Sequence, residues 1–294
     1  MALADPSVLA SPGGLAGVRS RVREARLPWI PIMVLITLLI LGIGADLLAP
    51  YDPTDSNLKS KSITPFTDLS HPLGTDLLGK DMLSRLIHGA RTTLQVTTPA
   101  MVIAVLVGTT IGLISGYSGR WIDAILMRIT DATLGFPSIL VAMLIVTLIG
   151  TGMMGVVVAV TATTWARFAR MIRGEVLVTR ERDFVTLARI LGVSPVMIVW
   201  RHIFPNVVNT LMVMISLTIG QVILLEASLS FLGLGMKPGE PAWGIMVAEG
   251  RQQLLTIWWL ALFPGVMITI VVMAFNFFGD WLRDYLDPRL RRAR

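Results

Sequence analysis

The sequence contains no cysteine and only three histidines, and both shortages exclude kinds of functional site. Without cysteine the chain has no disulfide, no thiol nucleophile and no cysteine-ligated metal. His71, His88 and His202 do not stand at metal-ligand spacing from one another, so a histidine metal site is not expected either. Charge is also scarce, because only 15% of the 294 residues are charged, against about a quarter in an ordinary soluble domain.

Hydrophobic residues make up 54% of the chain, and its mean hydropathy is +0.71. A helix needs about 20 mostly apolar residues to cross a bilayer. The sequence therefore predicts an all-α polytopic membrane protein. Six transmembrane helices are predicted, at Trp29–Leu48, Leu94–Ser115, Asp131–Ile149, Met153–Met171, Ile203–Leu232 and Leu254–Phe278. Little more than residues 150–152 separates the third span from the fourth, which predicts a tight helical hairpin.

The distribution of lysine and arginine predicts the orientation of these spans, since cytoplasmic loops of membrane proteins carry an excess of basic residues. With six spans both termini share one side, and that side holds 18 of the 25 basic residues. Both termini are therefore expected in the cytoplasm. The pI near 10.3 follows from this topology and does not indicate nucleic-acid binding. The first apolar run is too long for a signal peptide and is predicted to be an uncleaved anchor.

A polar segment separates the fourth and fifth predicted spans and reads RERDFVTLARILGVSPVMIVWRHIFPN from Arg180 to Asn206. Four of its apolar residues recur at helical spacing and predict an amphipathic helix, namely Phe184, Leu187, Ala188 and Leu191. Gly192 is expected to end that helix. Ser194 and Pro195 then predict the start of a second helix, as its N-cap and its first helical residue.

Two interpretations of this segment stay open on physical grounds alone. In the first, it is an interfacial amphipathic loop that lies on the lipid headgroups. In the second, its small apolar face, rimmed by arginine, docks into a groove of a cytoplasmic partner.

The segment resembles the coupling loop of ABC-importer permeases, whose pattern is E-A-A-x3-G-x9-I-x-L-P. Ala188, Gly192 and Pro205 match the pattern in type and spacing, whereas Thr186 and Leu187 replace its Glu-Ala. Three further strings resemble those of dipeptide, oligopeptide and nickel permeases: HPLGTDLLGKDMLSRLIHGARTTL (71–94), EASLSFLGLGMKPGEPAWG (226–244) and GDWLRDYLDPRL (279–290). The resemblance covers nearly the whole chain.

This resemblance implies a non-catalytic permease subunit of an ATP-driven importer in the bacterial cytoplasmic (inner) membrane. Its implied partners are a second homologous permease, two ATP-binding subunits that hold ATP and Mg, and an extracytoplasmic substrate-binding protein that delivers the peptide substrate. No cofactor is expected on this chain itself. The residues implied to couple to the ATP-binding subunits are Asp183, Phe184, Ala188, Arg189, Gly192 and Pro205.

The resemblance also divides the chain into expected parts. These are a cytoplasmic N-terminal tail (1–28), a first transmembrane anchor (29–48), an extracytoplasmic loop with a short interfacial helix (49–93), a five-helix permease core (94–280) that includes a coupling loop (174–205), and a cytoplasmic C-terminal tail (281–294).

The outer loop contains G-T-D-L-L-G-K from Gly74 to Lys80, which satisfies the spacing of a nucleotide-binding loop. Such a loop requires Ser or Thr next, whereas this chain has Asp81, whose carboxylate would repel phosphates. No strand pattern precedes it, and the predicted topology puts it outside the cell. We expect instead that Thr75 caps a short interfacial helix that ends at Gly89.

A few polar or small residues inside the predicted spans suggest roles there. Glu226 and Gln221 in the fifth span are expected to line or gate the translocation path, since ionisable groups in a membrane are usually functional; the alternative for Glu226 is a structural hydrogen bond beside Ser228 and Ser230. In the second span, glycines at 108, 112 and 116 predict close helix packing, as scaffold or against a partner permease. Arg128 and Asp131 are expected to form a local ion pair.

Three classes of function compete. The first is the peptide importer permease, with nickel or glutathione import as the alternative cargo. The second is a self-sufficient secondary transporter, which would favour inverted repeats and ion sites on broken helices; no such symmetry is evident in the sequence. The third is an intramembrane enzyme, but no Ser/His, paired-Asp or metal constellation converges in the predicted spans.

Overall fold

The computed structural model describes residues 27–286, and these are almost entirely helical. Nearly all of the predicted N-terminal tail and residues 287–294 of the predicted C-terminal tail lie outside the described residues. Within the described range, β-structure is confined to an isolated bridge between Thr75 and Asp81. The helices are α2 (Trp29–Ile43), α3 (Ala45–Leu48), η2 (Leu58–Ser60), α4 (Met82–Ser118), α5 (Arg120–Leu134), α6 (Ser138–Ile149), α7 (Met153–Thr179), α8 (Asp183–Ile190), α9 (Pro195–Ile198), η3 (Val199–Ile203), α10 (Phe204–Phe231), α11 (Trp243–Gly250), η4 (Arg251–Gln253) and α12 (Trp259–Leu286).

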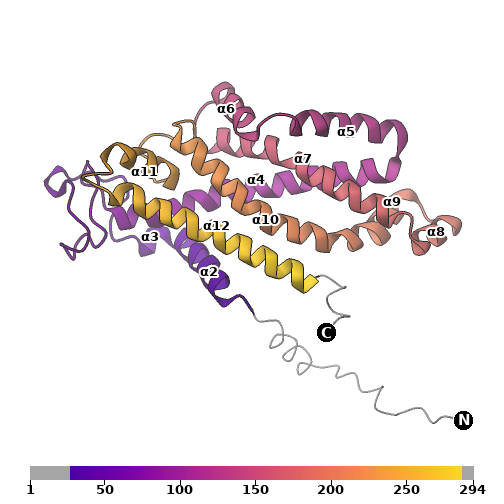
Figure 1. Cartoon of the computed structure of the whole chain (residues 1–294), viewed down its shortest axis with the longest axis horizontal. Helices are drawn as coiled ribbons and strands as arrows, with labels where there is room; N and C mark the ends of the chain where they lie inside the picture. The colour runs from indigo at the N-terminus through magenta and orange to yellow at the C-terminus, as the bar shows by residue number, and fades with distance from the viewer. Residues whose placement is uncertain (1–26, 287–294) are drawn as a thin grey trace, which may run out of the picture.

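The long helices α4, α7, α10 and α12 run lengthwise through the molecule (Figure 1). Helix α4 packs on α7, and α10 packs on α4, α7 and α12, so α10 lies in contact with all three of the others. The loop that precedes α4 and helix α11 lie at one end of the molecule (Figure 1). Helices α8 and α9 lie at the opposite end. The predicted outer loop and the predicted coupling segment therefore lie at opposite ends of the bundle (Figure 1).

Three helical segments are long and apolar enough to cross a membrane: Met82–Ser118, Pro195–Phe231 and Trp259–Leu286. The number rises to four if α5 and α6 together count as one broken span. Helix α2 is a shorter apolar helix of 15 residues, and a break at Gly44 separates it from α3. Helix α7 is 27 residues long but carries several arginines and does not belong to this apolar set.

The predicted third span is not a continuous helix. The sequence predicts one span over residues 131–149, whereas the structure has α5 and α6 meeting at an angle of 90°. Pro137 provides the physical reason, because it has no N–H to donate and forces the preceding residue, Phe136, out of the helical region. Helix α6 then ends at Ile149 and packs against α7, which begins at Met153. The predicted tight turn between these two helices is confirmed.

The glycine repeat in α4 faces α7. A Cβ atom added at Gly112 would lie 2.7 Å from the Ala169 carbonyl oxygen, and one added at Gly116 would lie 2.7 Å from the Val176 Cβ. A Cβ at Gly108 would likewise meet the α7 backbone. The predicted close packing is therefore confirmed, and it takes place within the chain, between α4 and α7.

The loop that precedes α4 is held to the helices by buried polar contacts. Arg85 is 1% exposed and donates to Asp76 at 2.6 Å and to Glu249 at 2.7 Å. Asp76 also accepts hydrogen bonds from the backbone N–H groups of Leu78 and Lys80. The G-x4-G-K segment is thus a turn closed by its own aspartate, and that aspartate binds Arg85.

The predicted short interfacial helix is wrong in both of its ends. Asp81 is the N-cap, since its side chain accepts from the Ser84 N–H at 2.8 Å, whereas Thr75 donates to the Ser60 carbonyl and accepts from the Ile63 N–H. The helix also does not stop at Gly89, because α4 continues without interruption to Ser118. Here Gly89 gives room for a neighbouring side chain and does not terminate the helix.

A second contact holds α3 to α4 at this end of the molecule. Arg91 binds Asp46 with two hydrogen bonds, of 2.6 and 2.9 Å, and also donates to the Gly42 carbonyl. These hydrogen bonds tie α3, which follows the first apolar helix, to α4.

Candidate functional site

The segment between α7 and α10 folds as the local sequence predicts. Helix α8 ends at Ile190, and Gly192 follows with φ of +75°, a conformation that glycine adopts without steric cost. Ser194 then caps α9, where its side chain accepts from the Met197 N–H, and Pro195 is the first helical residue. The predicted elbow of two short helices is confirmed.

The junction with α10 is built differently from an ordinary helix start. Residues 199–203 form a π-helical turn that leads directly into α10. Trp200 packs edge-on against Phe204, with ring centroids 5.2 Å apart, and the Asn206 amide donates to the His202 carbonyl at 2.7 Å. Pro205 lies exposed in the first turn of α10, so α9, η3 and α10 form one almost continuous helical path.

The face of α8 that packs on the rest of the chain is narrower than the predicted apolar stripe. Val185 and Ala188 are buried, at 0% and 5% exposed, and join Ile198 and Ile203 in the main hydrophobic core. Of the predicted stripe, only Ala188 is buried in this way. The stripe therefore divides, with its small residue turned toward the bundle and its large residues turned outward.

Seven large apolar side chains of this segment are exposed, and we refer to them together as the α8–η3 apolar surface. They are Phe184, Leu187, Ile190, Leu191, Val196, Met197 and Trp200. Leu187 is 59% exposed and Ile190 is 75% exposed. A concentration of exposed apolar side chains marks an interaction site for protein or membrane. The predicted apolar stripe does not include four of these residues, Ile190, Val196, Met197 and Trp200, although apolar residues on both sides of Gly192 indicate them in the sequence.

The polar residues predicted to couple lie around this surface. Asp183 is the first residue of α8 and Arg189 belongs to its last turn, and both are exposed. An acidic residue at the start and a basic residue at the end match the helix dipole. Arg180, just before α8, donates to the Gly116 carbonyl at 2.8 Å, which ties the segment to the end of α4.

The two residues predicted to line one path do not share a surface. Glu226 is 2% exposed and accepts a hydrogen bond of 2.8 Å from the Ser230 hydroxyl. Gln221 is exposed and accepts a hydrogen bond from Arg167 of α7. The two side chains therefore point in different directions from α10, because five residues along a helix correspond to a rotation of about 140°.

A row of three arginines on α7, spaced three residues apart, was not predicted from the sequence; it consists of Arg167, Arg170 and Arg173. Arg173 binds Asp123 through two hydrogen bonds of 2.6 and 2.7 Å, and Arg170 forms an ion pair with Asp131. Asp131 was expected to pair locally with Arg128, but its ionic partner comes from the neighbouring helix. Arg167, the first of the row, bonds to the neutral amide of Gln221.

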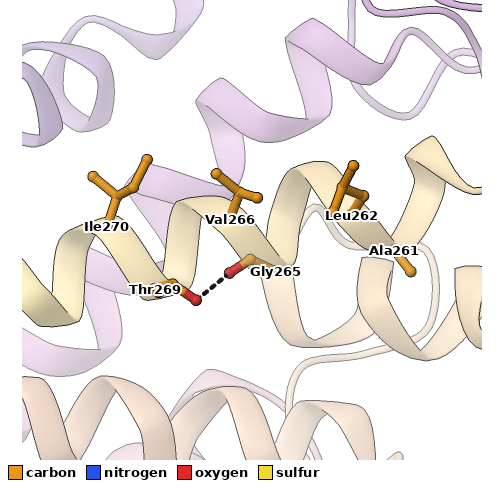
Figure 2. A pocket seen from close by; sticks show the side chains of 6 residues that line it. All are labelled: Ala261, Leu262, Gly265, Val266, Thr269 and Ile270. Atoms are coloured by element: carbon orange, nitrogen blue, oxygen red, sulfur yellow. Dashed lines mark hydrogen bonds between the residues drawn. The ribbon is translucent and has the colours of Figure 1, made fainter.

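A shallow apolar groove of about 400 Å³ runs along α12 (Figure 2). It is lined by Ala261, Leu262, Gly265, Val266, Thr269 and Ile270. Thr269 donates to the Gly265 carbonyl at 2.8 Å, so the one hydroxyl in the groove is already used within the helix. None of the predicted site residues lies in this groove. Among residues 27–286, no group of three or more His, Asp or Glu side chains is arranged to hold a metal ion.

Long apolar helices joined by an exposed amphipathic elbow define a helical membrane protein. Comparison with known proteins gives the class more narrowly. Residues 108–292 match the family described as binding-protein-dependent transport system inner membrane component. The chain belongs to this family of transport permeases.

Relatives of known name agree with the family. The chain is 39% identical over 259 residues to the glutathione transport system permease protein GsiD of Pectobacterium atrosepticum, covering 88% of this chain and 86% of the relative. It is 36% identical over 271 residues to the dipeptide transport system permease protein DppC of Alkalihalophilus pseudofirmus, with 92% and 88% covered. A putative peptide transport system permease protein of Brucella suis is 38% identical over 260 residues, with 87% of each chain covered.

Proposed function

We propose that this chain is the membrane-spanning permease subunit of an ATP-driven ABC importer that takes up dipeptides or oligopeptides. Its partners in this proposal are a second, homologous permease, two ATP-binding subunits and an extracytoplasmic substrate-binding protein. The observation that carries the proposal is the family match over residues 108–292. Relatives named for dipeptide and peptide transport, similar over nearly their whole length, support the substrate class.

The proposed topology has six crossings with both termini in the cytoplasm of a bacterial cell. The crossings are α2 with α3, α4, α5 with α6, α7, α10 and α12. The location of the loop before α4 and of α8 at opposite ends of the bundle supports this arrangement (Figure 1). In it the loop of residues 49–81 faces the binding protein, and the segment from Arg180 to Pro205 faces the ATP-binding subunits.

The α8–η3 apolar surface is the proposed contact with an ATP-binding subunit. Its large apolar side chains are exposed although the segment also carries exposed charges, Asp183 and Arg189 among them. An apolar face of short helices suits insertion into a hydrophobic groove. Gly192 and Pro205 would set the angles at which α8 and α10 leave the contact, and buried Ala188 would keep α8 close to the bundle.

In the proposed mechanism, ATP binding closes the two ATP-binding subunits and moves the α8–η3 surfaces of both permeases. Because η3 continues directly into α10, this movement reaches the helix that carries Gln221 and Glu226. Exposed Gln221 would line the path, whereas buried Glu226 would act as a gating residue that becomes accessible when α10 shifts. ATP hydrolysis then resets the bundle for release of the cargo into the cell.

Co-purification in mild detergent tests the coupling contact. Leu187→Asp and Ile190→Asp place a charge on the α8–η3 apolar surface without entering the core, and Leu69→Asp, at a residue 99% exposed in the loop before α4, is the matched control. We expect the two α8 variants to lose the ATP-binding subunits and the control to keep them. If both α8 variants retain these subunits, the proposed contact is wrong.

A second experiment tests the transport class itself. The assembled importer, reconstituted in vesicles, should accumulate labelled dipeptide only when ATP is supplied to the ATP-binding subunits. Uptake by this chain alone, without ATP, would instead establish a secondary transporter. Glutathione is the second candidate cargo, because one relative of 39% identity is named for it; competition of glutathione with labelled dipeptide distinguishes the two.

A further inference from the structure

The three arginines of α7 differ in how their charge is neutralised. Arg173 is neutralised by Asp123, and Arg170 by Asp131, both from α5. Arg167 has no carboxylate partner among residues 27–286, and its side-chain partner is the amide oxygen of Gln221. The row therefore contains two closed ion pairs and one guanidinium whose full positive charge is left over.

Along the axis of the bundle, Arg167 lies far from either end of α7. It is 14 residues from the first residue of α7, about 21 Å along the helix axis, and close to the middle of this helix. A guanidinium at such a depth is costly when it faces hydrocarbon. It is only half-buried, and its partner Gln221 is exposed. The open side of this pair must therefore face water or protein in the assembled transporter.

The orientation of Gln221 leaves further donors available. Its amide oxygen accepts from Arg167 Nη1, so its amide nitrogen carries two N–H groups for which no acceptor is present among the described residues. The remaining N–H groups of the Arg167 guanidinium likewise have no acceptor among the described residues. The pair thus offers a fork of N–H donors with one net positive charge, which is complementary to a carboxylate.

We propose that Arg167 and Gln221 form a binding site for the terminal carboxylate of the transported peptide, at mid-depth in the translocation path. This inference rests on the proposed peptide import. A peptide always carries such a carboxylate, whatever its side chains, so a site for it serves many cargoes. The neighbouring pairs of Arg170 and Arg173 are closed by aspartates and do not compete for the substrate.

A carboxylate of the second permease subunit would satisfy the same chemistry, and the test separates the two sources. The complete importer is reconstituted in vesicles, and ATP-driven uptake of labelled dipeptide is compared for Arg167→Gln, Arg167→Lys and Gln221→Glu. Arg128→Gln, at an exposed arginine of α5, is the matched control. Subunit composition of each purified complex and its ATP hydrolysis are measured alongside.

Gln221→Glu is the decisive variant, because it places a carboxylate beside Arg167 within the chain. If Arg167 receives the substrate, this internal partner occupies it, and uptake falls about tenfold or more, as it does for Arg167→Gln, the scale of one hydrogen bond to a charged group. Arg167→Lys should recover part of the rate, and the control should transport normally. Each variant should keep all subunits and its ATP hydrolysis.

Two outcomes overturn the inference. If Gln221→Glu transports at the wild-type rate, the Arg167–Gln221 contact only joins α7 to α10, since a stronger ion pair would serve that purpose equally well. If Arg167→Gln loses the second permease from the purified complex, the carboxylate belongs to that subunit. Failure of the unaltered importer to take up any peptide would instead contradict the proposed function, and so the two failures are distinguishable.

Discussion

The indole of Trp243 in α11 lies against Gly89 of α4, and its Nε1–H donates to the Leu86 carbonyl at 3.0 Å. Trp243 is 1% exposed. Any side chain at position 89 would have to displace this ring. The contact joins two segments 154 residues apart in the sequence and fixes α11 on α4.

Replacement of Gly89 by alanine is therefore expected to destabilise the protein by about 1–3 kcal/mol, the usual cost of forcing extra atoms into a packed site. Gly265→Ala in α12 is the matched control, because a Cβ there meets no atom within 4 Å and alanine favours the helix by about 1 kcal/mol. The midpoint temperature of thermal unfolding in detergent should fall for Gly89→Ala and should stay the same or rise for Gly265→Ala. Equal midpoints would show that Trp243 yields without cost.

Removal of the Arg85 guanidinium is expected to unfold the end of the bundle that carries the loop before α4. Arg85→Met leaves Asp76 buried without its cationic partner, and such a broken buried pair costs about 3–5 kcal/mol. Glu249→Gln is the comparison, since the Glu249 side chain is 40% exposed and partly exposed pairs contribute about 1 kcal/mol or less. The midpoint temperature of thermal unfolding in detergent should be much lower for Arg85→Met than for Glu249→Gln. Equal losses of stability in the two variants would mean that Asp76 finds new hydrogen-bond partners.

The left-handed conformation of Gly192 predicts a residue-specific cost at the elbow. Gly192→Ala should destabilise α8 locally by about 1 kcal/mol because of its Cβ, whereas asparagine tolerates this conformation better. Space is not the cause, since a Cβ at Gly192 meets no atom within 4 Å. Limited trypsin cleavage after Arg189 should be faster in the alanine variant than in Gly192→Asn. Identical rates for both variants and the native chain would remove backbone conformation as the reason for glycine here.

Glu226→Gln tests whether the buried carboxyl has a role beyond the fold. The amide oxygen still accepts from Ser230, so the variant should unfold within about 1 kcal/mol of the native protein. If Glu226 gates the path, ATP-driven uptake falls while stability and assembly are kept. Uptake at the native rate would leave Glu226 with a purely structural hydrogen bond, the alternative considered from the sequence.

The local parts of the candidate site could be predicted from the sequence because they depend on neighbouring residues alone. The Ser194 cap, the Pro195 start and the Gly192 turn require only short-range chemistry, and the structure confirms each. The glycine repeat of α4 likewise identified a packing face, although only the structure shows that the face belongs to α7. The coupling role of Asp183, Phe184 and Arg189 stays a prediction.

The predictions that were wrong concern features set by long-range contacts, or positions where two sequence patterns predict different structures. In the sequence Gly89 resembles a helix end, whereas its role depends on Trp243, which occupies the space beside it and lies far along the chain. The continuous apolar run over residues 131–149 predicted one helix, although Pro137 interrupts it. The surfaces of Gln221 and Glu226 could not be assigned, because which side of α10 faces α7, α11 or the open surface is a tertiary property.

Helix α4 is a single rod of 37 residues, about 55 Å long, whereas the hydrocarbon core of a bilayer is about 30 Å thick. Its first turn carries the buried Arg85 cluster, and its last turn binds Arg180. A tilt of α4 as one unit by about 5° around its centre would move its two ends by roughly 2 Å in opposite directions. Such a tilt would therefore couple the Arg85 cluster to the Arg180 contact, although about 50 Å separates them along the helix.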